Sequence, residues 1–170
     1  DKFKDNLSKE LPRIPCVKKV DDFRAFAKAG RALADLHVGY EQVAPYAATL
    51  SCDPGSLNAG QLRVEKMQHG KIKGAKEKDK TIIHYNPHIT ISDIPLAAYD
   101  YVVNGKPAIE WVMERQSIKT DKASGIINDA NLYATETMND PAYPLELLLR
   151  VITVSLETQK IVESLPKDIL

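Results

Sequence analysis

The sequence lacks an excess of charge of either sign. Its 23 lysines and arginines equal its 23 aspartates and glutamates in number, so the formal net charge at pH 7 is +0. A strongly basic composition would have indicated binding of nucleic acid by the surface as a whole. That class is excluded here, and any such contact must come from a local patch.

Cysteine and long hydrophobic runs are also scarce. Only Cys16 and Cys52 occur in 170 residues, which fits a reducing compartment better than a disulfide-rich secreted scaffold. No apolar run reaches the roughly 18 residues that a membrane span needs. We therefore expect a cytoplasmic chain without a membrane partner. Its 44% hydrophobic content is ordinary for a globular protein of this length.

Several catalytic motifs are absent as well. Residues 55–60 have the spacing of a phosphate-binding loop, but Gln61 and Leu62 follow in place of Lys and Ser or Thr. Residues 86–89 are similar to the Asn-Pro-Pro-aromatic loop of adenine methyltransferases, yet they lack the second proline and the aromatic residue. His84 and His88 have no cysteine cluster nearby. We expect a non-catalytic chain with no metal and no cofactor of its own.

The first twenty residues are predicted to be a connector. The chain begins at Asp1 without a methionine, so we expect it to be cut from a longer protein. Pro12 and Pro15 exclude a helix interior. We therefore expect residues 1–20 to be an extended link from a missing domain, and residues 21–170 to form one domain.

A long helix is predicted next. Apolar residues recur at helical spacing from Phe23 to about Val43, with Asp21 or Asp22 as the N-cap. A glycine in mid-helix costs about 1 kcal/mol relative to alanine, so Gly30 indicates close packing there. His37 lies on the apolar stripe of this helix, and we interpret it as a hydrogen-bonded core histidine rather than a catalytic one.

The remaining patterns predict a small sheet and two further helices. Alternating and β-branched residues between positions 61 and 91 favour three or four short antiparallel strands. A strand near residues 101–103, an Asn104-Gly105 turn and a short helix opened by Pro107 follow. The last helix has its stripe at residues 145–162 and stops at Pro166. The fold class is α+β: a long N-terminal helix, a small mainly antiparallel sheet, and short and long C-terminal helices.

The most basic stretch of the chain spans residues 63–80. It contains seven basic residues against three acidic ones. It could be a solvated hairpin tip, or it could be a loop that contacts phosphates. For the second case the candidate residues are Lys71, Lys73, Lys76, Lys78 and Lys80.

A polar stretch at residues 115–131 is the other candidate site. Lysine and arginine suit guanine edges or phosphates, and asparagine and glutamine suit adenine edges. The stretch could instead be ordered surface, with Lys119, Asp121 and Lys122 pairing locally. As DNA-contacting candidates we take Lys106, Arg115, Gln116, Lys119, Thr120, Lys122, Asn128 and Asn131.

Two groups of segments carry a family resemblance. Residues 11–15 (LPRIP) and residues 23–41, with Gly30-Arg31 and Leu36-His37, resemble the junction after the catalytic domain of large DNA adenine methyltransferases fused to restriction machinery. Residues 103–131 and 147–166 are similar to the C-terminal end of type ISP restriction-modification enzymes.

The resemblance implies a role in a larger enzyme. Members combine a nuclease, an ATP-driven translocase, a coupling region, an adenine methyltransferase and a C-terminal target-recognition domain, and this chain would be the last of these. It would bind double-stranded DNA at an asymmetric site while the methyltransferase flips the target adenine. S-adenosylmethionine, ATP and magnesium would serve the other domains. The alternative is a structural or coupling module that docks on the methyltransferase without reading bases.

Overall fold

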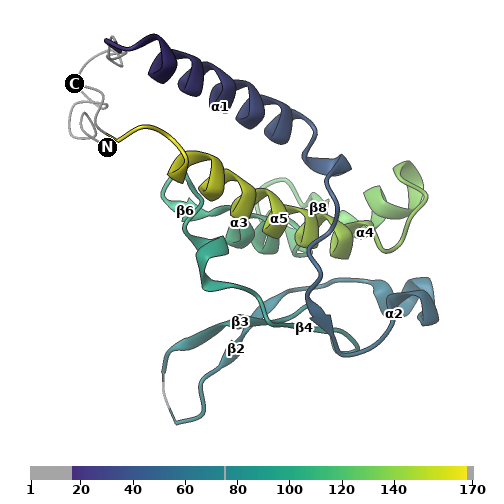
Figure 1. Cartoon of the computed structure of the whole chain (residues 1–170). Helices are drawn as coiled ribbons and strands as arrows, with labels where there is room; N and C mark the ends of the chain where they lie inside the picture. The colour runs from purple at the N-terminus through teal and green to yellow at the C-terminus, as the bar shows by residue number, and fades with distance from the viewer. Residues whose placement is uncertain (1–16, 75, 168–170) are drawn as a thin grey trace.

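The computed structural model describes residues 17–167 apart from residue 75, so the predicted LPRIP connector lies outside the described residues. Helix α1 (Val20–Val38) runs beside the long helix α5 (Tyr143–Glu163), and α3 (Ala108–Arg115) lies next to α5. A small sheet forms the opposite side of the molecule from α1 (Figure 1). The predicted α+β class is confirmed.

The sheet has four strands in the order β1-β4-β3-β2, and every neighbouring pair is antiparallel. The strands are β1 (Thr49–Leu50), β2 (Gln68–Lys71), β3 (Lys78–His84) and β4 (Thr90–Ser92). The expected antiparallel strands are therefore confirmed, and β1 is an addition. Leu62 is not in a strand: it ends α2 (Ala59–Leu62), because Asn58 and Gln61 form a reciprocal capping box there.

The hydrophobic core lies between the sheet and α5. Ile83 and Ile91 are directly paired on neighbouring strands and are fully buried. They belong to the same buried cluster as Leu148 and Ile152 of α5 and Ile109 of α3. Helix α5 is buried on several sides, as its wide apolar face predicts.

Helix α1 departs from its prediction in three ways. Its N-cap position is Lys19, which makes no side-chain cap, so neither Asp21 nor Asp22 is the cap. It ends at Val38 and is followed by a 3-10 turn (Tyr40–Gln42). Only Ala29 is buried, and a Cβ atom built on Gly30 would meet nothing within 4 Å. The expected close packing at Gly30 is wrong, because no layer formed by residues 17–167, leaving aside residue 75, covers that face of the helix.

The prediction that His37 is a hydrogen-bonded core residue is wrong about its burial but right about its hydrogen bond. The residue is exposed, and its ring stacks on Tyr101 with a centroid separation of 5.5 Å. Its Nε2 atom lies 3.0 Å from the Thr158 hydroxyl of α5. His37 therefore fastens the end of α1 to α5 at the edge of the molecule.

Short elements connect the two layers. Two 3-10 turns (Pro54–Ser56 and Leu96–Tyr99) flank the sheet strands, and β5 (Val102–Val103) pairs with β6 (Lys106–Pro107). Asn104 and Gly105 both have positive φ, which confirms the predicted turn. Pro107 is the N-cap of α3 rather than its first residue. A second hairpin, β7 (Lys119–Thr120) and β8 (Ile127–Asn128), is followed by α4 (Ala130–Leu132) and a π-turn (Tyr133–Thr137).

Candidate nucleic-acid interface

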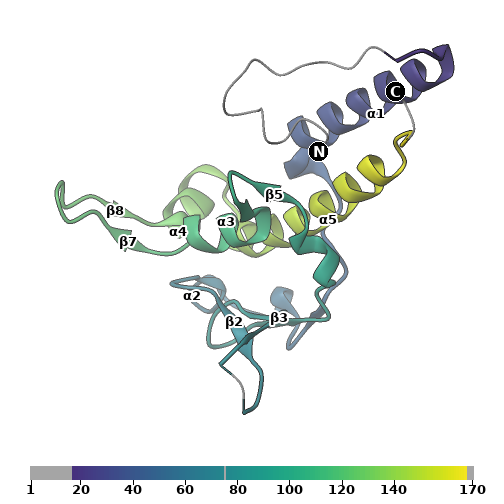
Figure 2. The same ribbon diagram turned by 90° about the vertical axis from the view of Figure 1, so that its left-hand side faces the viewer.

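The polar stretch at residues 115–131 forms an ordered hairpin, which we call the ribbon (residues 119–128). It extends away from the body of the molecule (Figure 2). Lys119 pairs with Asn128, and Thr120 pairs with Ile127. The Asp121 carboxylate accepts hydrogen bonds from the backbone of Ser124 at 2.8 Å and of Ala123 at 3.1 Å. These bonds close the turn, and those from Ser124 above all hold the pKa of Asp121 below its usual value.

Both ends of the ribbon are fastened to the short segment 63–65. Before β7, the backbone N–H of Ile118 donates to the carbonyl of Glu65 at 2.8 Å. After β8, the Asn131 side chain accepts from Val64 N–H at 2.9 Å and donates to the Val64 carbonyl at 2.7 Å. Asp129 forms an ion pair with Arg63. The position of the ribbon is therefore fixed by a segment more than fifty residues earlier in the chain.

Two of the candidate DNA-contacting residues are buried in the structure. Asn131 is 6% exposed and makes the anchor just described, and Gln116 is 5% exposed at the end of α3. Asn131 holds the scaffold, and neither side chain faces solvent. We therefore remove Gln116 and Asn131 from the set of candidate contacts.

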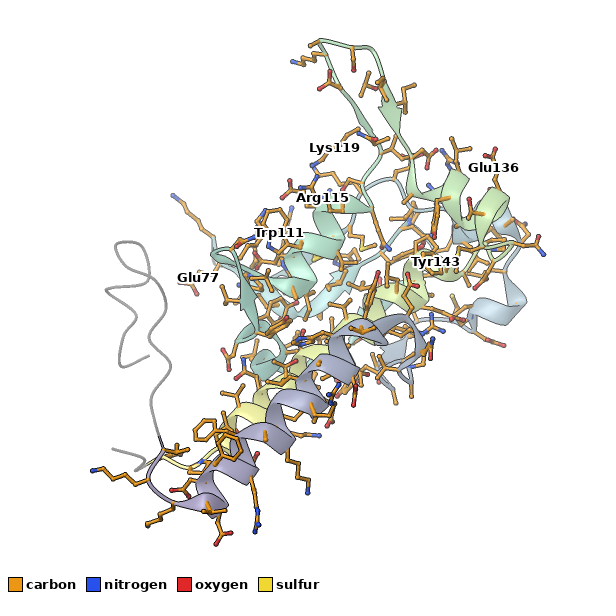
Figure 3. The ribbon with its side chains drawn as sticks, turned by 90° about the horizontal axis from the view of Figure 1, so that it is seen from above. Glu77, Trp111, Arg115, Lys119, Glu136 and Tyr143 are labelled. Carbon is orange, nitrogen blue, oxygen red and sulfur yellow. The ribbon has the colours of Figure 1, made fainter. Side chains whose placement is uncertain are left out.

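A cluster around Trp111 connects α3 to the β5–β6 hairpin. The Lys106 ammonium lies 4.3 Å from the Trp111 ring centroid, and the guanidinium of the exposed Arg115 lies 5.5 Å from it. The indole N–H donates to the Val103 carbonyl at 2.7 Å and so fixes the ring. Figure 3 shows Trp111, Arg115 and Lys119 in succession along α3 towards the ribbon.

A groove of about 380 Å³ lies between the β2–β3 hairpin and the α3–β7 segment. Four lysines and two glutamates are among its lining residues: Lys66, Lys78, Lys106, Lys119, Glu110 and Glu114. Glu114 binds both Lys106 and Lys119, and these hydrogen bonds hold its pKa below the usual value. Lys80 forms an ion pair with Glu110 at 2.9 Å. Three of the candidate lysines are thus already paired with carboxylates.

The tip of the β2–β3 hairpin is different. Lys71, Lys73, Lys76 and Lys78 are exposed there, and none forms an ion pair within the described part of the chain. The hairpin points in a different direction from the ribbon (Figure 2). Unpaired lysines on a projecting turn suit phosphate contacts, because no internal partner competes for them.

A second polar groove, of about 710 Å³, lies on the outer face of the sheet and was not predicted. Arg63, Lys66, Gln68, His84 and His88 are among its lining residues. Strand alternation alone could have placed Gln68 and His84 on one outward face, since they are direct partners in the register. Nothing local in the sequence shows that Arg63 lies beside them.

Residues 17–167, leaving aside residue 75, contain neither a metal-binding cluster nor a membrane-spanning helix. No group of three His, Cys, Asp or Glu side chains there could hold a metal ion. None of the described helices combines the length and apolarity that a bilayer crossing demands.

Three solved structures are similar to this chain. The ATP-dependent type ISP restriction-modification enzyme LlaBIII bound to DNA is 43% identical with a TM-score of 0.79, covering 97% of this chain and 10% of that one. A nuclease-deletion mutant of the type ISP enzyme LlaGI with a DNA substrate mimic is 42% identical (TM-score 0.77), covering 97% and 12%. A DrdV–DNA complex is 29% identical (TM-score 0.75), covering 99% and 16%.

The chain therefore spans between a tenth and a sixth of the length of these relatives. A search of curated proteins finds no match. The family model described as the type ISP C-terminal specificity domain matches residues 1–147. Together with the fold and the two projecting hairpins, this match shows that the chain belongs to the type ISP C-terminal specificity domains.

Proposed function

We propose that this chain recognises a DNA sequence on behalf of a single-chain restriction-modification enzyme. The observation that carries the proposal is the ribbon: a projecting two-stranded element held at both ends, in a chain of a specificity-domain family. The relatives LlaBIII, LlaGI and DrdV were each solved with DNA or a DNA mimic. The proposed partner is double-stranded DNA read at an asymmetric site.

The shape of the ribbon suits this role. The major groove of B-form DNA admits a two-stranded β-ribbon, and sequence is read there through hydrogen bonds and apolar contacts to base edges. The exposed Thr120, Lys122 and Asn128 lie on the ribbon and remain candidates for such contacts. Arg115 and Lys119 lie at its base: Lys119 lines the groove between the hairpins, and Arg115 lines a separate pocket beside Trp111.

The basic tip of the β2–β3 hairpin has the complementary role. Phosphate contacts position a protein on DNA without carrying sequence information. Lys71, Lys73, Lys76 and Lys78 are exposed on the β2–β3 hairpin, which projects from the sheet (Figure 2). In this proposal they bind the backbone while the ribbon enters the groove.

The rest of the activity belongs to other domains. We infer that the chain is non-catalytic and works with a methyltransferase and a coupling domain of the same polypeptide, next to a translocase and a nuclease. S-adenosylmethionine, ATP and magnesium would be bound by those domains. Flipping of the target adenine would follow recognition by this one.

The test compares the removal of each hairpin tip in the full-length enzyme. In the first variant, residues 119–128 are replaced by Asn-Gly between Ile118 and Asp129. In the control, residues 71–78 are replaced by Asn-Gly between Gly70 and Asp79, which are direct partners. Binding is measured on the cognate duplex, identified by methylation mapping, and on a scrambled duplex.

The two variants should lose different properties: the first should lose sequence preference, and the control should lose affinity for any duplex. Without the ribbon, the preference for the cognate duplex should fall by about a hundred-fold or more, because several base contacts of roughly 1–3 kcal/mol each are lost. The control should weaken binding to both duplexes alike. A ribbonless enzyme that folds, by circular dichroism, and keeps the full cognate preference would overturn the proposal.

A second candidate function is docking on the methyltransferase, and α1 favours it. Val20, Phe23 and Val38 are 65%, 63% and 86% exposed on this helix. Apolar side chains left open in this way suit a protein interface. If α1 docks in this manner, Phe23→Ser should weaken association of the chain with the separately expressed methyltransferase and leave the cognate preference of the isolated chain unchanged. Unaltered association would remove this candidate.

A further inference from the structure

The ribbon has two chemically different faces. Directly paired residues of an antiparallel hairpin share a face, and the side chains of each strand alternate between faces. Thr120 and Ile127 are direct partners, so they form one face, which we call the methyl face. Lys119 and Asn128 are the next pair and occupy the other, the charged face, which Ile126 shares by alternation.

The isoleucines are unusually open to solvent. Ile126 is 62% exposed and Ile127 is 61% exposed, because the ribbon projects from the body and no other described element covers either of its faces. They contribute nothing to the buried cluster between the sheet and α5. Exposed apolar side chains gathered on a projecting element indicate a binding contact.

We propose that the methyl face lies against base edges in the major groove and that Ile127, with the Thr120 methyl group, recognises the C5-methyl group of a thymine. This inference rests on the proposed function of the chain. The thymine methyl is the apolar group that base edges present in the major groove, so it is the natural partner of an exposed aliphatic side chain.

The charges favour the methyl face over the charged face. Alternation places Asp121 on the charged face, and its turn hydrogen bonds keep it ionised. Glu114, at the base of that face, is paired with Lys106 and Lys119, so Asp121 is the carboxylate that opposes close approach of that face to a polyanion. On the methyl face, the acidic residue at the base is Asp129, which Arg63 neutralises.

The position of the isoleucines argues against a wedge between base pairs. Proteins that unstack DNA insert an apolar wedge between base steps, and a wedge at the leading point of this ribbon would have to lie in its turn. Residues 122–125 form the turn and are Lys, Ala, Ser and Gly, and Ile126 and Ile127 follow it. The leading point of the ribbon therefore carries no large apolar side chain, and the isoleucines on its flank are placed to meet base edges.

The test replaces each thymine of the cognate site in turn by deoxyuridine, which removes only the C5-methyl group. For the unmodified full-length enzyme, one replacement should weaken binding about four-fold, the equivalent of one buried methyl group. Ile127→Ala should abolish the sensitivity at that position. Ile126→Ala changes a neighbouring residue of nearly equal exposure on the opposite face, and this variant should keep the sensitivity to deoxyuridine.

Four results would overturn the inference: no sensitive thymine, sensitivity that persists in Ile127→Ala, sensitivity lost in Ile126→Ala, or a rise in the fluorescence of 2-aminopurine placed away from the target adenine that disappears in Ile127→Ala, which reports unstacking by a wedge. In each of these cases, a preserved preference for cognate over scrambled DNA would still agree with the proposed function. An unmodified enzyme that lacks this preference, or one that keeps it when the ribbon is removed, overturns the proposed function instead.

Discussion

The two projecting hairpins are held in place in opposite ways. The β2–β3 hairpin grows out of the four-stranded sheet, and at Gly70 a Cβ atom would come within 2.9 Å of Ile82, so the strands there are tightly packed. The ribbon has two strands of two residues each, and no other strand in the described part of the chain pairs with it. An isolated two-stranded hairpin is marginally stable in water. The direction of the ribbon therefore depends on its anchors at residues 63–65.

The hairpins differ in chemistry too. Unpaired lysines dominate the tip of the first, whereas the ribbon mixes amide, hydroxyl and aliphatic groups. Charge alone attracts any duplex, but a mixed surface on a fixed support can distinguish one base edge from another. The comparison indicates that the sheet hairpin supplies affinity and the ribbon supplies discrimination.

The largest expected effect comes from the anchor. Asn131→Ala leaves the N–H and the carbonyl of the fully buried Val64 unpaired, which should lower the free energy of unfolding by about 2–4 kcal/mol. Urea denaturation measures the loss. Asn128→Ala, an exposed amide on the ribbon itself, is the matched control and should change stability little.

The same anchor variant should also impair discrimination while leaving salt-dependent binding to scrambled DNA intact. Equal losses of stability in the Asn131 and Asn128 variants would show that the ribbon does not depend on its anchor at residues 63–65. The proposed difference in how the two hairpins are held would then be wrong.

The turn glycines give the second prediction. Gly125 in the ribbon and Gly74 in the sheet hairpin have φ values of +70° and +82°, and a Cβ atom at either would meet nothing within 4 Å. An alanine therefore brings backbone strain of about 1–2 kcal/mol without a clash. Gly125→Ala should accelerate amide hydrogen exchange across residues 119–128 by about 5- to 30-fold.

Gly74→Ala is the matched control and should leave the exchange of the ribbon unchanged. Gly125→Asn should restore slow exchange, because asparagine tolerates a positive φ. Fast exchange of the ribbon in the unmodified chain, equal to that of Gly125→Ala, would mean that the ribbon is not held in one conformation.

Local patterns predicted the elements whose burial follows from their own sequence. Helix α5 carries apolar residues on several sides, so its place in the core was evident. The Asn104-Gly105 turn needs only two residues with positive φ. The strands β3 and β4 are rich in β-branched residues. In each case the signal lies within a few consecutive residues.

The wrong predictions for α1 and for Asn131 have a common cause. Helical spacing shows which face of α1 is apolar, but it does not show that no layer covers Phe23. An asparagine in a polar stretch suits a base edge as well as a buried backbone group. Asn131 is a buried anchor because its side chain pairs with the backbone of Val64, which lies 67 residues away. Long-range partners decide such cases, and a single sequence does not display them.

The third prediction concerns the lysines of the sheet hairpin. The double variant Lys73→Ala, Lys76→Ala should weaken binding to cognate and scrambled duplexes alike, by about 3- to 10-fold at moderate salt. The slope of log K against log salt should fall by about 1.8, since each lost phosphate contact contributes roughly 0.9. The ratio of the two affinities should not change. A change in that ratio would assign sequence readout to this hairpin and reverse the comparison.

The smallest expected effect is at Glu114, which lies in the groove between the hairpins and pairs with Lys106 and Lys119. Phosphates must compete with this carboxylate for the two lysines. Glu114→Gln should therefore tighten binding to scrambled DNA by roughly two- to five-fold, the range expected for one exposed ion pair. The matched control is Glu157→Gln, which breaks a similarly exposed pair with Lys160 on α5.

The pH dependence gives the sign of the Glu114 effect independently. Hydrogen bonds from Lys106 and then Lys119 lower the folded pKa of Glu114. Its contribution to stability is thus complete above the unfolded pKa and is lost as the pH falls through the lowered folded value. Protonation removes the same charge as Glu114→Gln, so acidification through that folded pKa should tighten scrambled-DNA binding in the unmodified chain more than in the variant. Equal pH responses of the unmodified chain and Glu114→Gln would show that the Glu114 carboxylate does not compete with phosphates for Lys106 and Lys119. The groove would then act, like the β2–β3 hairpin, as a phosphate-binding surface.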